Sequence, residues 1–104
     1  MKFISIIVTI AVAFLIQADS PVSADCKCND IPLYGRVQVV DRFADFHVQV
    51  VDRFEDIRVD TVGSFPDECG KWQMVDRFPD FTVEFVESFP DFKIRYVDSF
   101  PGID

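Results

Sequence analysis

From residue 37 to the C-terminus, hydrophobic and polar positions follow a pattern that recurs every 11 residues. A typical copy has apolar residues at alternate positions, then a valine, an acid, a phenylalanine, a corner and another apolar residue. Copies begin at residues 37, 48, 59, 72, 83 and 94, so two residues, Gly70 and Lys71, are inserted once. Because a repeat of this kind decides the architecture, it is the first feature to interpret. The insertion divides the array into residues 37–69 and 72–104, with three copies each.

The 11-residue period has a helical and an extended interpretation. A helix with this period would form a right-handed supercoil. However, proline occupies the eighth position of four copies, and each proline would destabilise a helix by ~3 kcal/mol or more. The residues between the prolines are β-branched or aromatic, which favours strands. We therefore predict an all-β fold in which residues 46–52 form a strand and residues 53–56 a corner, with the same elements in every copy.

Side-chain alternation within this strand predicts that both of its faces are covered. Phe46, Val48 and Val50 point to one face and Val51 to the other. We expect the invariant valines of the fourth position and phenylalanines of the seventh position to be core residues, the phenylalanines as one buried layer. Trp72 replaces a Val or Ile and is expected to fill a gap between the halves. The two sets are Val40, Val51, Val62, Val75, Val86 and Val97, and Phe43, Phe54, Phe65, Phe78, Phe89 and Phe100.

Residues 1–24 have the organisation of a secretory signal peptide. Lys2 supplies the positive start, residues 3–16 are apolar, and Val22-Ser23-Ala24 is a small-residue cleavage site. An apolar run of this length would span ~21 Å as a helix, which is shorter than the ~30 Å hydrocarbon core of a membrane. We therefore predict cleavage after Ala24, a secreted or periplasmic product and no stable membrane anchor after cleavage.

The charge of the chain restricts its partners. The formal net charge is −8, and since Lys2 and Asp19 cancel, all of it belongs to residues 25–104. Such acidity argues against nucleic acid or an anionic lipid surface as a partner. The mature chain is the length of one domain, and we expect it to be a monomer. Chains this short commonly need a covalent staple.

The repeats resemble a known family. The segments that carry the resemblance are Cys-x-x-Ile-Pro-Leu-Tyr-Gly-x-Val from Cys28, the V-x-V-V-D-x-F-x-D-F copies, Pro-Asp-x-Cys-Gly-Lys-Trp-Gln from Pro66, and a terminal Val-Asp-Ser-Phe-Pro-Gly. Together they are similar to the 7(1) septoil knot domain family of bacteria. The resemblance implies a small, deeply knotted β domain with two interwound halves and carries no biochemical activity. Periodicity alone predicts an unknotted β-solenoid, because knots are almost absent from proteins.

Three cysteines are available for a disulfide, which an exported protein retains. Cys26 and Cys28 are too close in sequence to form a disulfide with each other comfortably. One of them is therefore expected to pair with Cys69 and the other to stay unpaired. Cys26 lies outside the pattern that carries the family resemblance. We predict the Cys28–Cys69 pair, which closes a loop worth ~4 kcal/mol in the chain-entropy model.

The candidate sites for metal ions or catalysis have simpler structural explanations. Ten acids recur after the strands and in the corners, as in a calcium ladder, but the corners lack the glycines that such a ladder needs. We expect each corner acid to cap its own turn. A Cys3His zinc site would need the three cysteines and His47, but C-x-C is not the usual zinc spacing and export favours oxidation. The ten acids are Asp41, Asp45, Asp52, Asp56, Asp67, Asp76, Asp80, Glu87, Asp91 and Asp98.

These observations favour a protein without enzymatic activity. The sequence contains one histidine, no Gly-x-Ser-x-Gly motif and no phosphate-binding loop. We therefore expect no cofactor and no metal. We predict an exported module with a structural or binding role, whose partner is a protein or a glycan. A secreted antagonist or inhibitor is the alternative, and an exposed aromatic patch would favour the binding module.

Overall fold

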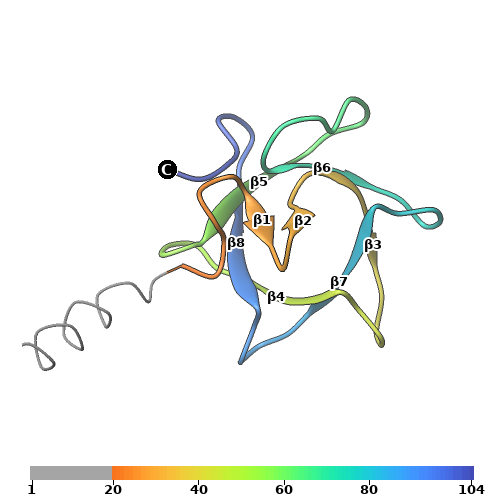
Figure 1. Ribbon diagram of the computed structural model, residues 1–104, viewed down its shortest axis with the longest axis horizontal. Helices are drawn as coiled ribbons and strands as arrows, with labels where there is room; N and C mark the ends of the chain where they lie inside the picture. The colour runs from red at the N-terminus through yellow and green to blue at the C-terminus, as the bar shows by residue number, and fades with distance from the viewer. Residues whose placement is uncertain (1–19) are drawn as a thin grey trace, which may run out of the picture.

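The computed structural model describes residues 20–104, and most of the expected signal peptide lies outside these described residues. Eight strands and no helix occur in this part of the chain (Figure 1). The first two, β1 (Lys27–Cys28) and β2 (Ile31–Pro32), pair antiparallel as a short hairpin. The remaining six fall one to each repeat. The predicted all-β class is therefore confirmed.

The six repeat strands close into a barrel, in which every neighbouring pair is parallel. The barrel order is β3-β6-β5-β8-β4-β7, and Figure 1 shows these strands as a ring. The strands are β3 (Gly35–Val39), β4 (Phe46–Val50), β5 (Ile57–Thr61), β6 (Lys71–Met74), β7 (Phe81–Phe85) and β8 (Phe92–Tyr96).

Strands of the two halves alternate round the barrel. Each of β3, β4 and β5 lies between two of β6, β7 and β8, so every barrel pairing joins the first half to the second. The fourth-position valines reinforce this arrangement, because their backbone N–H groups donate to first-position carbonyls of the other half at 2.8–2.9 Å. The halves are therefore interwound, as the family resemblance implies, and the unknotted solenoid is excluded.

The barrel interior is filled by two rings of side chains that alternate with polar, outward-facing residues. The tenth-position residues Phe46, Ile57, Phe81 and Phe92 form one ring, and their aromatic members meet edge to face. The first-position residues form the next ring, in which Trp72 is fully buried as predicted. The members of this second ring are Val37, Val48, Val59, Trp72, Val83 and Ile94.

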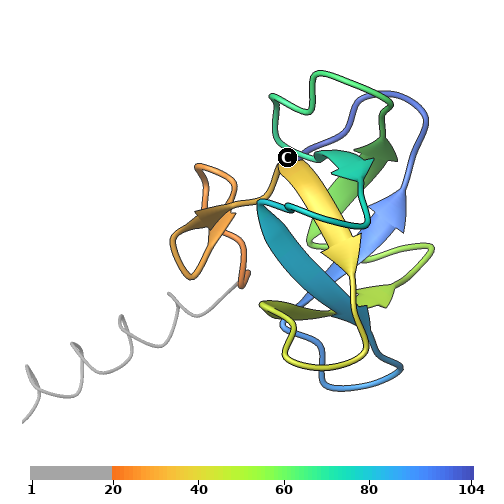
Figure 2. The ribbon, with the colours of Figure 1, turned by 90° about the vertical axis from the view of Figure 1, so that its right-hand side faces the viewer.

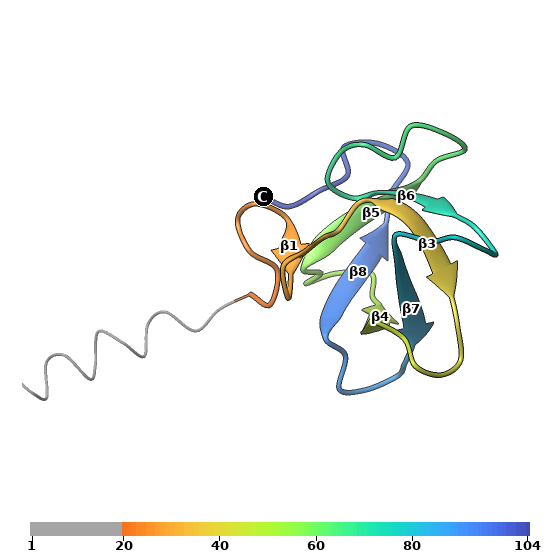
Figure 3. The same cartoon turned by 45° about the vertical axis from the view of Figure 1, so that its right-hand side comes forward.

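The β1–β2 hairpin covers one end of the barrel, where it lies beside the ring of strands in Figure 2 and Figure 3. Cys26, Cys28 and Leu33 are buried and belong to the same core cluster as the barrel residues. The Leu33 carbonyl accepts hydrogen bonds from Trp72 Nε1 and from the backbone N–H of Gly70, both at 3.1 Å. No residue with a side chain can replace Gly70, because a Cβ atom there would overlap the carbonyl oxygen of Arg58.

The prediction that the seventh-position phenylalanines form a buried layer is wrong. All six are between 74% and 95% exposed. Alternation assigns a side chain to the core only inside a strand, and these residues lie in the corners between strands. The prediction that the fourth-position valines are core residues is also wrong, because each of them lies just beyond its strand and is half-buried. The exposed set is Phe43, Phe54, Phe65, Phe78, Phe89 and Phe100.

The disulfide joins Cys26 to Cys69, and Cys28 is a buried free thiol. The predicted Cys28–Cys69 pair is therefore wrong. Both cysteines are buried, but Cys28 lies within β1, whereas Cys26 precedes the strand with a left-handed backbone (φ 65°) and meets Cys69 at a Cα–Cα distance of 5.9 Å. Burial raises the pKa of the Cys28 thiol, and the nearby carboxylates of Asp91 and Asp56 add to this effect.

Candidate binding surfaces

The corners of the chain project round the outside of the barrel (Figure 1). Each of the six repeats has a phenylalanine in its corner. We call these six seventh-position residues the corner phenylalanines. Every one has a left-handed backbone, with φ between 53° and 63°. Such a conformation is uncommon for a bulky residue and costs roughly 1–2 kcal/mol.

Folding alone gives no reason for phenylalanine at these six positions. The side chains bury little surface, so they contribute little hydrophobic stabilisation. Glycine or asparagine would meet the left-handed backbone at lower cost. Large exposed apolar residues also increase the risk of aggregation. Repetition of a bulky apolar residue in all six corners makes these positions candidates for contact with another molecule.

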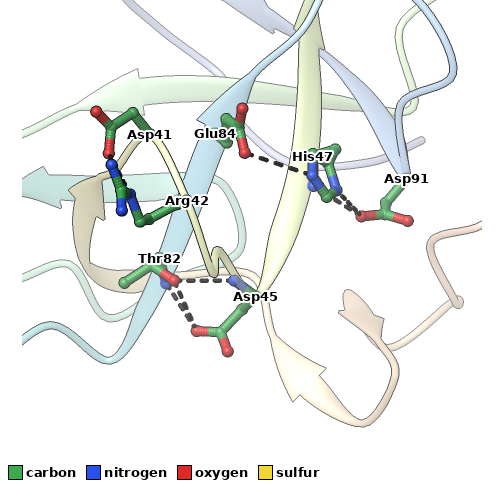
Figure 4. Close-up of polar contacts among 7 residues, drawn as sticks. All are labelled: Asp41, Arg42, Asp45, His47, Thr82, Glu84 and Asp91. Atoms are coloured by element: carbon green, nitrogen blue, oxygen red, sulfur yellow. Dashed lines mark hydrogen bonds and ion pairs between the residues drawn. The ribbon is translucent and has the colours of Figure 1, made fainter.

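The corner acids at the ninth position attach four of the six corners to the opposite half. Asp91 Oδ2 accepts a hydrogen bond from the backbone N–H of His47 (2.7 Å), while the Asp91 N–H donates to the His47 carbonyl (2.6 Å). Asp45 likewise accepts from the N–H of Thr82 (2.9 Å), as Figure 4 shows. The prediction that these acids cap their own turns is therefore wrong. The four such pairs are Asp45 with Thr82, Asp56 with Lys93, Asp80 with Arg36, and Asp91 with His47.

The third and sixth copies depart from this pattern. Gly102 stands in place of the sixth corner acid, and it exchanges two backbone hydrogen bonds of 2.9 Å with Arg58. Asp67 makes no side-chain hydrogen bond to the described residues. The insertion directly after its copy, at Gly70 and Lys71, changes the path of the chain there.

His47 lies between two carboxylates on the outside of the barrel (Figure 4). Its Nε2 is 3.4 Å from Glu84 Oε1, and its Nδ1 is 3.6 Å from Asp91 Oδ2. Cys26 and Cys69 are joined to each other, so the cysteines are not available as a zinc-binding set with His47. Among residues 20–104, no group of three or more His, Cys, Asp or Glu side chains is arranged to hold a metal ion.

The end of the barrel opposite the hairpin is open and apolar. The last residue of each barrel strand occupies the third repeat position and faces the same side as the buried first-position residue before it. Met74, for example, pairs across from Val37. These residues nevertheless remain exposed, because the strands end there. We call this ring the open end, and it consists of Val39, Val50, Thr61, Met74, Phe85 and Tyr96.

Sequence reasoning did not identify the open end as a surface. Its signal was present, since the third position is apolar in five of six copies. Alternation alone places such a residue inside the barrel. The third-position residue is exposed because the strand ends there. The apolar valine that follows makes the strand look longer in the sequence and so hides this end.

A surface cavity of about 650 Å³ lies beside the corner after β8 and is lined by Arg58 and Arg95 among others. Both guanidinium groups are already paired. Arg58 Nη1 bonds to Asp104 Oδ1 at 2.8 Å, and Arg95 Nε lies 3.1 Å from Glu55 Oε1. This cavity therefore offers no uncompensated positive charge to an anionic ligand.

Comparison with protein families identifies the fold. Residues 30–104 match the model of the 7(1) septoil knot domain. This chain belongs to the 7(1) septoil knot family. The family resemblance drawn from the repeats is thus confirmed, and the interwound barrel is the architecture of this septoil knot domain. No curated protein matches the chain.

Family membership supplies the fold of the septoil knot domain and no biochemical activity. The part of the chain that the structure describes contains no helix of the length and hydrophobicity needed to cross a membrane. The surfaces that distinguish this domain are thus the corner phenylalanines and the open end.

Proposed function

We propose that this septoil knot domain is an exported, non-enzymatic module that binds a protein or a glycan in the cell envelope or outside the cell. The observation that carries the proposal is the set of six corner phenylalanines, which are exposed and held in an unfavourable backbone conformation. A Cys26–Cys69 disulfide is compatible with an oxidising compartment. The binding module is favoured over a secreted antagonist because exposed aromatic residues are common at interaction sites.

Crosslinking in the native envelope tests this role. A photoreactive amino acid replaces Phe89, which is 95% exposed, and in a control protein it replaces Gln49 on the outer face of β4. We expect the Phe89 position to capture a defined partner that the Gln49 position does not, identified by mass spectrometry. Replacing the remaining corner phenylalanines with serine should abolish the capture. Equal capture from both positions would contradict the proposal, and release with growth inhibition of neighbouring cells would support the antagonist instead.

Export is tested by the intact mass of the product, which should begin at Asp25. In the structure Val22 is buried against the core, and the Ser23 carbonyl accepts a hydrogen bond of 2.9 Å from the backbone N–H of Cys26. Cleavage after Ala24 would remove both contacts. A product that starts before Ser20 would retain them and would move the predicted cleavage site towards the N-terminus, while an unprocessed product would contradict export.

A further inference from the structure

The open end has an aromatic sector formed by three neighbouring strands. In the barrel order β4 lies between β7 and β8, so Val50 at the end of β4 lies between Phe85 and Tyr96. All three are 41% to 48% exposed. Their backbones are fixed by pairing on the strands, and Val50 and Phe85 lie directly across from the buried Ile94 and Val48. This sector is therefore a rigid apolar surface, whereas the corner phenylalanines project separately from one another.

The second residue after the end of each of these strands is an acid. They are Asp52, Glu87 and Asp98, and all are exposed. Glu87 and Asp98 are followed by serines, unlike Asp52, which is followed by Arg53. Neither Glu87 nor Asp98 forms an ion pair with another described residue, so the acids that follow Phe85 and Tyr96 give the aromatic sector a border of unpaired negative charge.

We propose that the open end of the barrel binds a basic amphipathic segment of another protein. The apolar side chains of that segment pack on Phe85, Val50 and Tyr96, and its lysines or arginines lie against Glu87 and Asp98. An apolar centre with a charged border is the usual composition of a protein interface. Opposite charge at the border increases the association rate and excludes acidic competitors. The surface is distinct from the corner phenylalanines, so the proposal goes beyond the function proposed above.

Charge disfavours the other occupants of such a surface. Two copies meeting open end to open end would bring their acidic borders together, and like charges facing one another oppose association. An anionic membrane is disfavoured for the same reason, since the chain carries a net charge of −8. A basic segment satisfies both the apolar centre and the border.

A synthetic amphipathic peptide of leucine and lysine is the probe, titrated into the full mature protein and followed by isothermal titration calorimetry. We expect binding that weakens as salt is added, because the border charges are exposed. A peptide with glutamate in place of lysine should not bind. A scrambled leucine–lysine peptide, whose leucines share no face, should bind more weakly.

Two phenylalanines of one repeat form the matched variants. Phe85→Ser should lower the affinity by about five-fold or more, as expected when a central aromatic contact is lost. Phe89→Ser, in the adjacent corner, should change the affinity by less than about two-fold. The double variant E87Q/D98N should weaken binding and reduce its salt dependence. Thermal melts confirm that each variant is folded, and amide chemical shifts should change at the open end in the wild-type protein.

Several results would overturn the proposal. They are no binding of the leucine–lysine peptide, equal loss of affinity in the Phe85 and Phe89 variants, and chemical-shift changes confined to the hairpin end. Binding to phosphatidylglycerol vesicles that Phe85→Ser abolishes would assign the open end to a membrane instead. A concentration-dependent dimer that Phe85→Ser disrupts would assign it to a second copy of the chain. The crosslinking experiment on the corner phenylalanines is independent of all these results.

Discussion

Three of the six repeats place two phenylalanines three residues apart, and the environments of these two residues are opposite. Phe78 is 74% exposed in a corner, whereas Phe81 is 1% exposed in β7. The two differ in position relative to the strand and not in residue type. Composition therefore cannot separate them, and alternation does so only once the strand boundary is known.

This contrast predicts opposite results from two alanine substitutions. Phe81→Ala should destabilise the domain by about 3–5 kcal/mol, because it leaves a cavity among Phe46 and Trp72. Phe78→Ala should change the free energy of unfolding by no more than about 0.5 kcal/mol. Urea unfolding of both variants measures the difference. A comparable loss in Phe78→Ala would show that the corner is buried.

The ion pair of Glu55 with Arg95 joins a corner of the first half to a strand of the second. The hydrogen bond from Arg95 lowers the pKa of Glu55 below its usual value. A carboxyl with a lowered pKa in the folded state stabilises the protein above the unfolded pKa of about 4.3. This contribution to the free energy of unfolding is lost as the pH falls through the pKa of Glu55 in the folded protein.

Replacement of Glu55 should therefore have an effect that depends on pH. Glu55→Gln should destabilise the domain by about 0.5–1 kcal/mol at pH 7, and the difference from wild type should vanish in strong acid. Glu68→Gln is the control, because Glu68 is exposed and pairs with Lys71 within its own local segment. Thermal melts over the pH range measure both. A difference that grows towards low pH would contradict the assigned pKa direction.

At the scale of the elements, the sequence was most informative about the strands and least informative about their corners. The period located all six barrel strands. The role of the corner acids was missed, because Asp45 bonds to Thr82 and Asp91 to His47 across the two halves. No local pattern records partners so distant in sequence. The cysteine pairing was missed for a similar reason, since it depends on which of the two cysteines lies beside Cys69 in the fold.

The cross-half hydrogen bonds predict that equivalent corner acids differ in importance. Asp91→Ala removes the acceptor of the His47 N–H and should cost about 1–2 kcal/mol. Asp67→Ala removes a carboxylate without such a bond and should cost less than about 0.5 kcal/mol. Chemical denaturation of both variants tests this. Equal losses would mean that the corner acids act locally.

At the scale of the whole molecule, stability is shared between the halves. All six neighbouring strand pairs of the barrel are cross-half pairs. The disulfide between Cys26 and Cys69 closes a covalent loop that contains the first half, and the second half is wound with it. Unfolding should consequently be slow, because the chain ends must be withdrawn through the structure.

Separated halves should therefore be unfolded monomers. Residues 25–69 and 72–104, produced as two chains, each lose every strand partner that they have in the barrel. At low concentration we expect the NMR spectrum of either chain to show little dispersion of its amide proton chemical shifts. We also expect neither chain to show a cooperative thermal melt. A well-dispersed spectrum from a monomeric half would show that the array is separable and would contradict the interwound architecture.

Strict alternation of the two halves also has a consequence for the ancestry of the fold. In this barrel each three-repeat unit pairs with the other unit and never with itself, as the two chains of an intertwined dimer do. Gene duplication and fusion of a three-repeat protein would give such a barrel, with the Gly70-Lys71 insertion at the point of fusion. Before the fusion, the same contacts would have linked two polypeptides without a knot. A knot in a single chain can then arise from joining two partners that are already entwined.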